Sequence, residues 1–155
     1  MATRKNSQVK SKKRVKDFAE VYTAEREVKS MCDLIPLDIW QDTVATFLEP
    51  ACGNGAFLKE ILSRKLSNCI TPAQGLCALE SIYGVDIQAD NVEESKQALF
   101  DIYLKKFGKS CAIYGYLAMK ILDRNIVCAD SLKLSDLLAN HDWDESLRIY
   151  REAQA

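Results

Sequence analysis

The sequence lacks the features that mark several classes of protein. No apolar run approaches the ~20 residues that a membrane-spanning helix needs, and no apolar segment follows the basic residues at its start. Neither a membrane span nor a secretory signal is therefore expected. The sequence has one histidine, His141, and none of its six cysteines lie in C-x-x-C spacing, which argues against a zinc site. We expect no bound metal, and reduced thiols in a cytoplasmic protein.

Charge is distributed unevenly along the 155 residues, whose composition, 48% hydrophobic and 28% charged, is typical of one globular domain. Residues 1–16 carry seven of the 21 Lys and Arg residues and no acid, whereas the remainder is acidic. This basic leader has two interpretations: a segment attracted to nucleic-acid phosphates, or a solvated, disordered terminus. We expect a disordered leader over 1–16 and a single domain over 17–155.

Three short apolar runs, at residues 44–48, 82–87 and 125–129, predict buried β-strands. Segments with helical spacing of apolar residues lie between them, so an α/β fold with a parallel sheet is predicted. The edge strands of such a short sheet stay open unless the C-terminal helices, a second copy of the chain or another chain covers them.

Helix signals occupy most of the remaining sequence, and residues 37–42 are expected to be a connection with Trp40 against the core. The first expected helix is capped by Thr23 and ended by Pro36, the second buries Leu58, Ile61, Leu62 and Lys65, and the third starts at Thr71-Pro72. The fourth runs from the capping-box pair Asp90 and Glu93 to Gly108, and a fifth covers 113–121. Helices are also expected over 134–150, with an apolar stripe of Trp143, Leu147 and Tyr150.

Polar or glycine-rich residues follow each predicted strand, at the end of a parallel sheet where ligands bind. The turn at residues 49–55 has two glycines and leads into a helix, whose first backbone amides suit a charged group. Asp86 ends the second strand and can accept hydrogen bonds from two ribose hydroxyls. Asp130 ends the third and can accept one from an exocyclic amine. These residues predict an adenosine ligand with a charged tail; the simpler interpretation is an ordinary turn and solvated acids.

S-adenosylmethionine (AdoMet) and NAD both fit that description, and two features separate them. The NAD fingerprint requires a third glycine and an acid ~20 residues farther on, whereas Gly53 and Gly55 have no third partner and Asp86 lies farther along the chain. Glu49, just before the glycines, suits a ligand with an ammonium group, which a pyrophosphate lacks. Both features favour AdoMet.

Residues 49–58, E-P-A-C-G-N-G-A-F-L, resemble the D/E-P-A-C-G-S-G-x-F-L signature of AdoMet-dependent DNA adenine-N6 methyltransferases of restriction–modification systems. Upstream, residues 20–24 (E-V-Y-T-A) are similar to the G-E-x-F-T-P segment of that family. Downstream, residues 83–87 (Y-G-V-D-I) and 125–132 (N-I-V-C-A-D-S-L) resemble its second and third motifs. The four segments have the order of the family and span roughly residues 17–132.

The resemblance implies a Rossmann-like methyltransferase fold, truncated to three parallel strands, and a role for each matching residue. Thr23, Ala51, Gly53 and Gly55 would hold the methionine part of AdoMet, and Glu49 would face its ammonium group. Asp86 would bind the ribose hydroxyls, Ile87 would lie against the adenine, and Asp130 would accept from the adenine amine. Ala24 and Asn54 replace the proline and the serine that the family has at these positions.

The family's catalytic motif, N-P-P-Y or D-P-P-Y, is absent, because none of Pro36, Pro50 and Pro72 lies in such a sequence. In that family this motif receives and stacks the flipped target adenine. We therefore expect an AdoMet-binding part of a DNA adenine methyltransferase that is inactive alone, has no catalytic residues of its own, and needs a partner chain for the missing strand and for target recognition. The alternative is a catalytically silent AdoMet-binding or interaction module.

Overall fold

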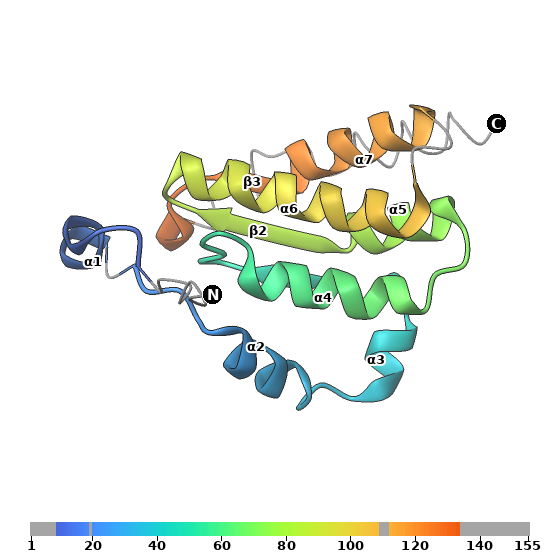
Figure 1. Cartoon of the computed structure of the whole chain (residues 1–155), viewed down its shortest axis with the longest axis horizontal. Coiled ribbons are helices and arrows are strands. Elements are labelled where there is room, and N and C mark those ends of the chain that lie inside the picture. Colours follow the sequence, from blue (N-terminus) through green and yellow to red (C-terminus); the bar gives the residue numbers. More distant parts are fainter. Residues whose placement is uncertain (1–8, 19, 109–111, 134–155) are drawn as a thin grey trace, which may run out of the picture.

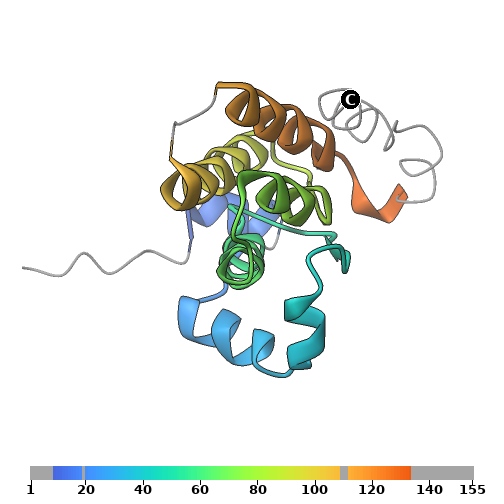
Figure 2. The same cartoon turned by 90° about the vertical axis from the view of Figure 1, so that its right-hand side faces the viewer.

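A computed structural model describes residues 9–18, 20–108 and 112–133, which form an α/β fold around a three-stranded parallel sheet (Figures 1 and 2). The elements are α1 (Lys12–Phe18), α2 (Glu25–Cys32), α3 (Leu37–Gln41), β1 (Phe47–Glu49), α4 (Ala56–Ser67), α5 (Pro72–Glu80), β2 (Ile82–Asp86), α6 (Ala89–Phe107), α7 (Ala112–Asn125), β3 (Ile126–Cys128) and the 3-10 turn η1 (Ser131–Lys133). None of the described helices combines the length and the apolar character needed to cross a membrane. The helices expected over 134–150 lie outside the described residues.

The three predicted strands are confirmed, and they pair in the order β1-β2-β3. Phe47 lies opposite Ile82, and Gly84 lies opposite Ile126, in two parallel ladders. Within the described residues β1 is therefore an edge strand. Because the Phe47 N–H donates to the Ser81 carbonyl at 2.8 Å, the N–H and C=O of Leu48 point the other way, toward the open edge. The Leu48 side chain is 46% exposed.

The first strand starts three residues later than predicted, because the chain before it is held in a turn. The Val44 N–H donates to the Asp42 side chain at 2.9 Å, and the Ala45 N–H donates to the Asp42 carbonyl at 3.3 Å. Asx turns of this kind compete with strand pairing. The predicted connection over 37–42 is also wrong in part, since residues 37–41 form α3. Its Trp40 is buried as expected and stacks on Phe47, with ring centroids 5.2 Å apart.

Helices α4 and α6 lie side by side against one face of the sheet, and α2 and α3 lie on the outer side of α4 (Figures 1 and 2). Gly84 of β2 permits this close packing, because a Cβ atom there would lie 2.7 Å from Cδ1 of Leu58. The predicted buried face of α4 is confirmed for Leu58, Ile61, Leu62 and Lys65.

The starts of two helices differ from the predictions. Asp90 does not cap α6, which begins at Ala89 after Gln88, and the Asp90 carboxylate instead binds Lys10 and Arg14. The N-cap of α2 is Ala24, and Thr23 does not cap it. The start of α5 is as predicted: Thr71 and Gln74 form a capping box ahead of Pro72.

Residues 1–8 of the basic leader lie outside the described residues, whereas its later residues are ordered in a helix. Residues 12–18 form α1, which crosses the expected boundary between residues 16 and 17. Arg14 pairs with Glu20 and, at 2.6 Å, with Asp90, and Lys10 pairs with Asp90 at 2.9 Å and with Glu94 at 2.6 Å. Acids at the start of α6 therefore offset part of the leader's charge.

A buried lysine lies beside the turn that precedes β1. The Lys65 side chain is fully buried, and its Nζ donates to the backbone carbonyls of Asp42 at 3.2 Å and Ala45 at 2.5 Å. The ammonium also lies 5.2 Å from the centre of the Phe47 ring. Burial lowers the pKa of Lys65 to about 8.

We expect Lys65 to make the free energy of unfolding rise with pH in the alkaline range, a contribution that the Lys65→Met variant lacks. Between pH ~8 and ~10.5 the unfolded chain holds a proton on Lys65 that the folded chain has released, so the free energy of unfolding rises with pH. Urea denaturation of both proteins at several pH values tests this. Methionine does not titrate, so the difference in free energy of unfolding between the two proteins should change across that pH interval. A difference that stays constant with pH would contradict the pKa assignment.

Candidate functional site

The turn between β1 and α4 is held against β2 and α6. The Cys52 N–H donates to the Val85 carbonyl at 2.9 Å, so the turn continues alongside the second strand. Gly53 and Gly55 have φ values of 54° and 83°, which only glycine adopts readily. A Cβ atom on Gly55 would lie 2.8 Å from Oγ of Ser95 in α6. These contacts fix where the first amides of α4 lie.

Asp86, at the end of β2, ties this turn to the start of α6. Its Oδ2 accepts the Gly53 N–H at 2.9 Å. Its Oδ1 accepts the Gln88 N–H at 2.8 Å and Nδ2 of Asn91 at 3.2 Å. A carboxylate has about four acceptor positions, so protein donors fill three of them. The side chain remains half exposed.

A cavity of about 270 Å³ opens at the carboxyl ends of the three strands, and five of the eight predicted site residues line it. They are Ala51, Gly53, Asp86, Ile87 and Asp130. Ile87 is 53% exposed and so offers an apolar surface to the cavity. Asp130 accepts the Leu132 N–H on Oδ1 at 3.0 Å. The sheet topology thus brings together residues that are about 80 positions apart in the sequence.

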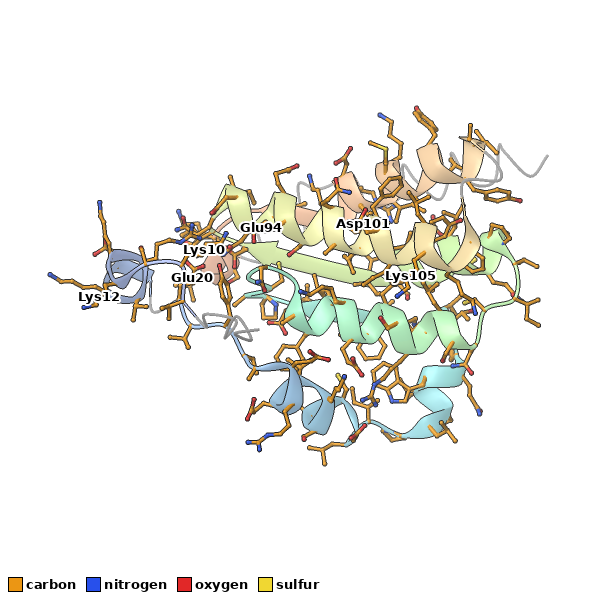
Figure 3. The ribbon with its side chains drawn as sticks, in the orientation of Figure 1. Lys10, Lys12, Glu20, Glu94, Asp101 and Lys105 are labelled. Atoms are coloured by element: carbon orange, nitrogen blue, oxygen red, sulfur yellow. The ribbon has the colours of Figure 1, made fainter. Side chains whose placement is uncertain are left out.

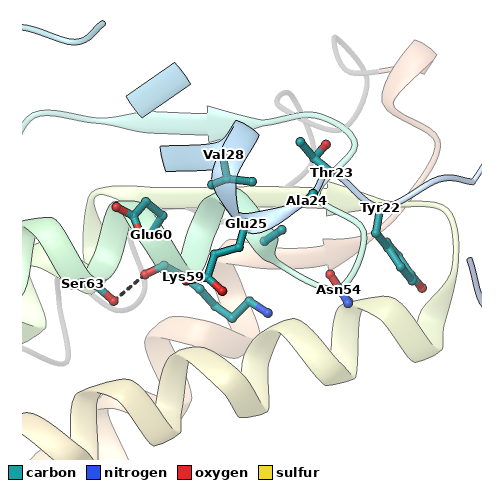
Figure 4. A pocket seen from close by; sticks show the side chains of 10 residues that line it. Tyr22, Thr23, Ala24, Glu25, Val28, Asn54, Lys59, Glu60 and Ser63 are labelled. Carbon is teal, nitrogen blue, oxygen red and sulfur yellow. Dashed lines mark hydrogen bonds between the residues drawn. The ribbon is translucent and has the colours of Figure 1, made fainter. Parts of the chain in front are cut away.

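A second, larger cavity of about 620 Å³ lies between the segment before α2 and the start of α4 (Figure 4). Thr23 lines this cavity, together with Glu25, Asn54 and Lys59. Tyr22 borders both cavities. Six of the eight predicted residues therefore line two adjoining cavities that share Tyr22.

Glu49 and Gly55 line neither cavity. Glu49 is half buried at the end of β1, and its Oε1 accepts the Ala51 N–H at 3.2 Å. This hydrogen bond stabilises the turn. Gly55 is buried beneath the turn, where it is the N-cap of α4 and allows Ser95 to approach. Both residues thus shape the site through the backbone.

Three residues that the sequence analysis did not assign also belong to the first cavity: Glu20, Tyr22 and Asn91. Tyr22 packs over Gly53, and its hydroxyl donates to Glu20 at 2.5 Å and contacts Asn91 at 3.0 Å. Burial and the hydrogen bond to Glu20 raise the pKa of Tyr22 to about 12, so it remains a neutral donor. Residues 20–24 matched a motif, but Asn91 carried no sequence signal beyond its position five residues after Asp86.

Cys52 is a packed residue and not an activated thiol. Its side chain is 6% exposed, and burial, with the nearby charge of Asp86, raises its pKa to about 12. Cys32, Cys52, Cys69 and Cys128 are free thiols. The described residues contain no cluster of three or more His, Cys, Asp or Glu side chains that could hold a metal ion.

Comparison with protein-family models, with curated proteins and with solved structures gave no match for this chain. The arguments about its function therefore rest on the geometry and chemistry of the two cavities.

Proposed function

We propose that these residues bind S-adenosylmethionine, as the cofactor part of a DNA adenine-N6 methyltransferase with a Rossmann-like sheet. One observation carries the proposal: the turn after β1, the acid after β2 and the acid after β3 line one cavity. Ligands of parallel α/β sheets bind at this end of the strands. The resemblance of residues 20–24, 49–58, 83–87 and 125–132 to the methyltransferase motifs supplies the identity of the ligand.

The donor and acceptor groups fit an adenosine. Asp86 has an acceptor position beyond its three protein donors for one ribose hydroxyl, and the second hydroxyl can share a carboxylate oxygen with those donors. Ile87 offers an apolar face for the adenine ring, and Asp130 offers a carboxylate oxygen to its amine. The methionine part would extend past Tyr22 toward Thr23 and the start of α4 in the second cavity. AdoMet itself would supply the methyl group.

The proposal assigns no catalytic residue to these 155 residues. The sequence contains no N-P-P-Y or D-P-P-Y motif, so the groups that receive the target adenine would come from elsewhere. A strand from a partner chain could pair with the backbone of Leu48 at the open edge of β1. The exposed residues Lys12, Lys13 and Lys16 of α1 would be available to DNA phosphates. We place this activity in the cytoplasm.

The same absence favours a second candidate, an AdoMet-binding module that never transfers a methyl group. Both candidates predict cofactor binding, and only the first predicts methylation of DNA when a chain carrying the missing motif is added. A methyl-transfer assay with radiolabelled AdoMet, with and without such a chain, separates them.

Isothermal titration of the purified protein with AdoMet tests the shared part of the proposal, with NAD as the comparison ligand. We expect saturable binding of AdoMet and much weaker binding of NAD, because residues 53–58 lack the third glycine of the NAD fingerprint. If AdoMet gives neither binding heat nor a thermal shift, the proposed function is wrong.

A further inference from the structure

Asn91, near the start of α6, has a side chain that is almost fully buried, with 1% of the residue exposed. Its amide lies within hydrogen-bond distance of four polar groups. Nδ2 donates to Asp86 and to Glu20, both at 3.2 Å. Oδ1 accepts from Lys10 at 2.9 Å and contacts the Tyr22 hydroxyl, whose single proton is donated to Glu20, at 3.0 Å. One buried amide therefore joins the end of β2 to the N-terminal segment.

We call that segment, residues 10–22, the N-terminal strap. Ion pairs hold it beside the cavity. Lys10 binds Asp90 and Glu94, and Arg14 binds Asp90 and Glu20, so two cations face three acids. Figure 3 shows Lys10 close to Glu20 and Glu94, whereas Lys12 projects away from them. The strap ends in residues 20–22, which form one wall of the 270 Å³ cavity.

The protonation states of the strap suit this role. Hydrogen bonds from Arg14 and Lys10 hold the pKa of Asp90 far below its usual range. Burial opposes ionisation of Glu20, but hydrogen bonds from Tyr22, Arg14 and Asn91 outweigh it and lower its pKa. The ion pairs therefore persist at neutral pH. They are partly exposed, with the Asp90 side chain 51% exposed, so salt should weaken them.

We propose that Asn91 is a positioning residue that couples docking of the N-terminal strap to the cofactor site. It orients the Asp86 carboxylate with one N–H and holds the strap through its bonds to Glu20 and Lys10 and its contact with Tyr22. The strap in turn supplies a wall of the cavity, so ligand binding and strap docking stabilise each other. This inference rests on the proposed binding of AdoMet and identifies residues that regulate its affinity from outside the recognised motifs.

The double variant Lys10→Gln with Arg14→Gln removes the charged anchors of the strap. Its matched control, Lys105→Gln with Lys106→Gln, removes the same amount of charge from exposed positions at the C-terminal end of α6. We expect the first variant to bind AdoMet about 5-fold more weakly at low salt, as the loss of several partly exposed ion pairs implies. The control should stay within about 2-fold of wild type. Added salt should weaken wild type more than the first variant.

Hydrogen exchange provides a readout independent of affinity. AdoMet should slow exchange of the backbone amides at residues 20–24 in wild type and in the control variant. In the Lys10→Gln, Arg14→Gln variant these amides should exchange faster without ligand, because the strap is less firmly docked.

Asn91→Asp tests the positioning role directly, because the aspartate keeps the acceptors for Lys10 and Tyr22 but loses the donors to Asp86 and Glu20. We expect the variant to bind AdoMet more weakly than wild type at pH 8. Its affinity relative to wild type at the same pH should recover as the pH falls to 5. A carboxyl between two other acids has a raised pKa and donates again once it is protonated. Gln97→Glu, which makes the same charge change at an exposed position of α6, is the matched control.

The outcomes are distinct. Binding of AdoMet with equal affinity by wild type and all variants, with unchanged exchange at residues 20–24, would overturn the coupling and leave the proposed function intact. Absence of AdoMet binding by wild type would overturn the proposed function, and the coupling with it.

Discussion

Asp86→Asn should lower the affinity for AdoMet by about 100-fold or more, because a charged acceptor of two ribose hydroxyls is lost and each such bond contributes roughly 1.5–3 kcal/mol. The change keeps the volume of the side chain. In the wild-type protein the carboxylate accepts hydrogen bonds from the N–H groups of Gly53 and Gln88. The asparagine would present to them either an NH₂ group or an amide oxygen, which is a weaker acceptor. Titration calorimetry measures the affinity, and thermal unfolding shows how much of the effect is a loss of stability.

Asp130→Asn is the informative comparison, because an amide oxygen can still accept a hydrogen bond from the adenine amine. We expect a loss of about 10-fold or less for this variant. Asp101→Asn, on the exposed side of α6, should leave the affinity unchanged. Equal effects of the Asp86 and Asp130 substitutions would argue against separate contacts with the ribose and the base.

Gly55→Ala should destabilise the folded protein by about 2–4 kcal/mol. A φ of 83° costs a residue with a Cβ atom roughly 1–2 kcal/mol, and insertion into a packed site costs a further 1–3 kcal/mol. The new methyl group would lie 2.8 Å from Oγ and 3.2 Å from Cβ of Ser95. If the backbone moves to relieve this close contact, the turn and the first amides of α4 will be displaced, so ligand affinity should fall as well. Urea denaturation measures the change in stability.

Gly115→Ala is the matched control for this substitution. Gly115 lies within α7, and a Cβ atom there would have no other atom within 4 Å. Alanine in a helix interior is favoured over glycine, so this variant should gain about 0.5–1 kcal/mol. If Gly55→Ala proved as stable as wild type, the strained geometry of the turn would be incorrect.

The sheet and five of the residues that line the 270 Å³ cavity could be predicted, because both depend on local patterns in the sequence. Short apolar runs that end in an acid or a glycine turn identify parallel strands, and parallel strands bring their carboxyl ends together. Asp86 and Asp130 were placed correctly on that basis alone. The late start of β1 was missed, since it depends on a turn built around Asp42 and on the carbonyls that Lys65 binds.

The docked leader could not be predicted from charge alone. A basic segment is equally consistent with a disordered tail, and two of its three partner acids, Asp90 and Glu94, are 76 to 84 residues away in the sequence. Asp90 illustrates the difficulty, because its spacing from Glu93 predicts a helix cap, whereas its carboxylate binds Lys10 and Arg14. Asn91 was missed for the same reason: its four partners come from four separate positions along the chain.

The buried thiol of Cys52 makes the turn observable by chemical kinetics. Alkylating reagents attack the thiolate, so a thiol with 6% exposure and a pKa of about 12 should react only when the turn opens. Cys128, which is exposed at the end of β3, should be labelled first. The slow labelling rate of Cys52 then measures how often the turn detaches from Val85, and a ligand that binds only the closed turn should lengthen the labelling time by a factor of one plus the free ligand concentration divided by Kd.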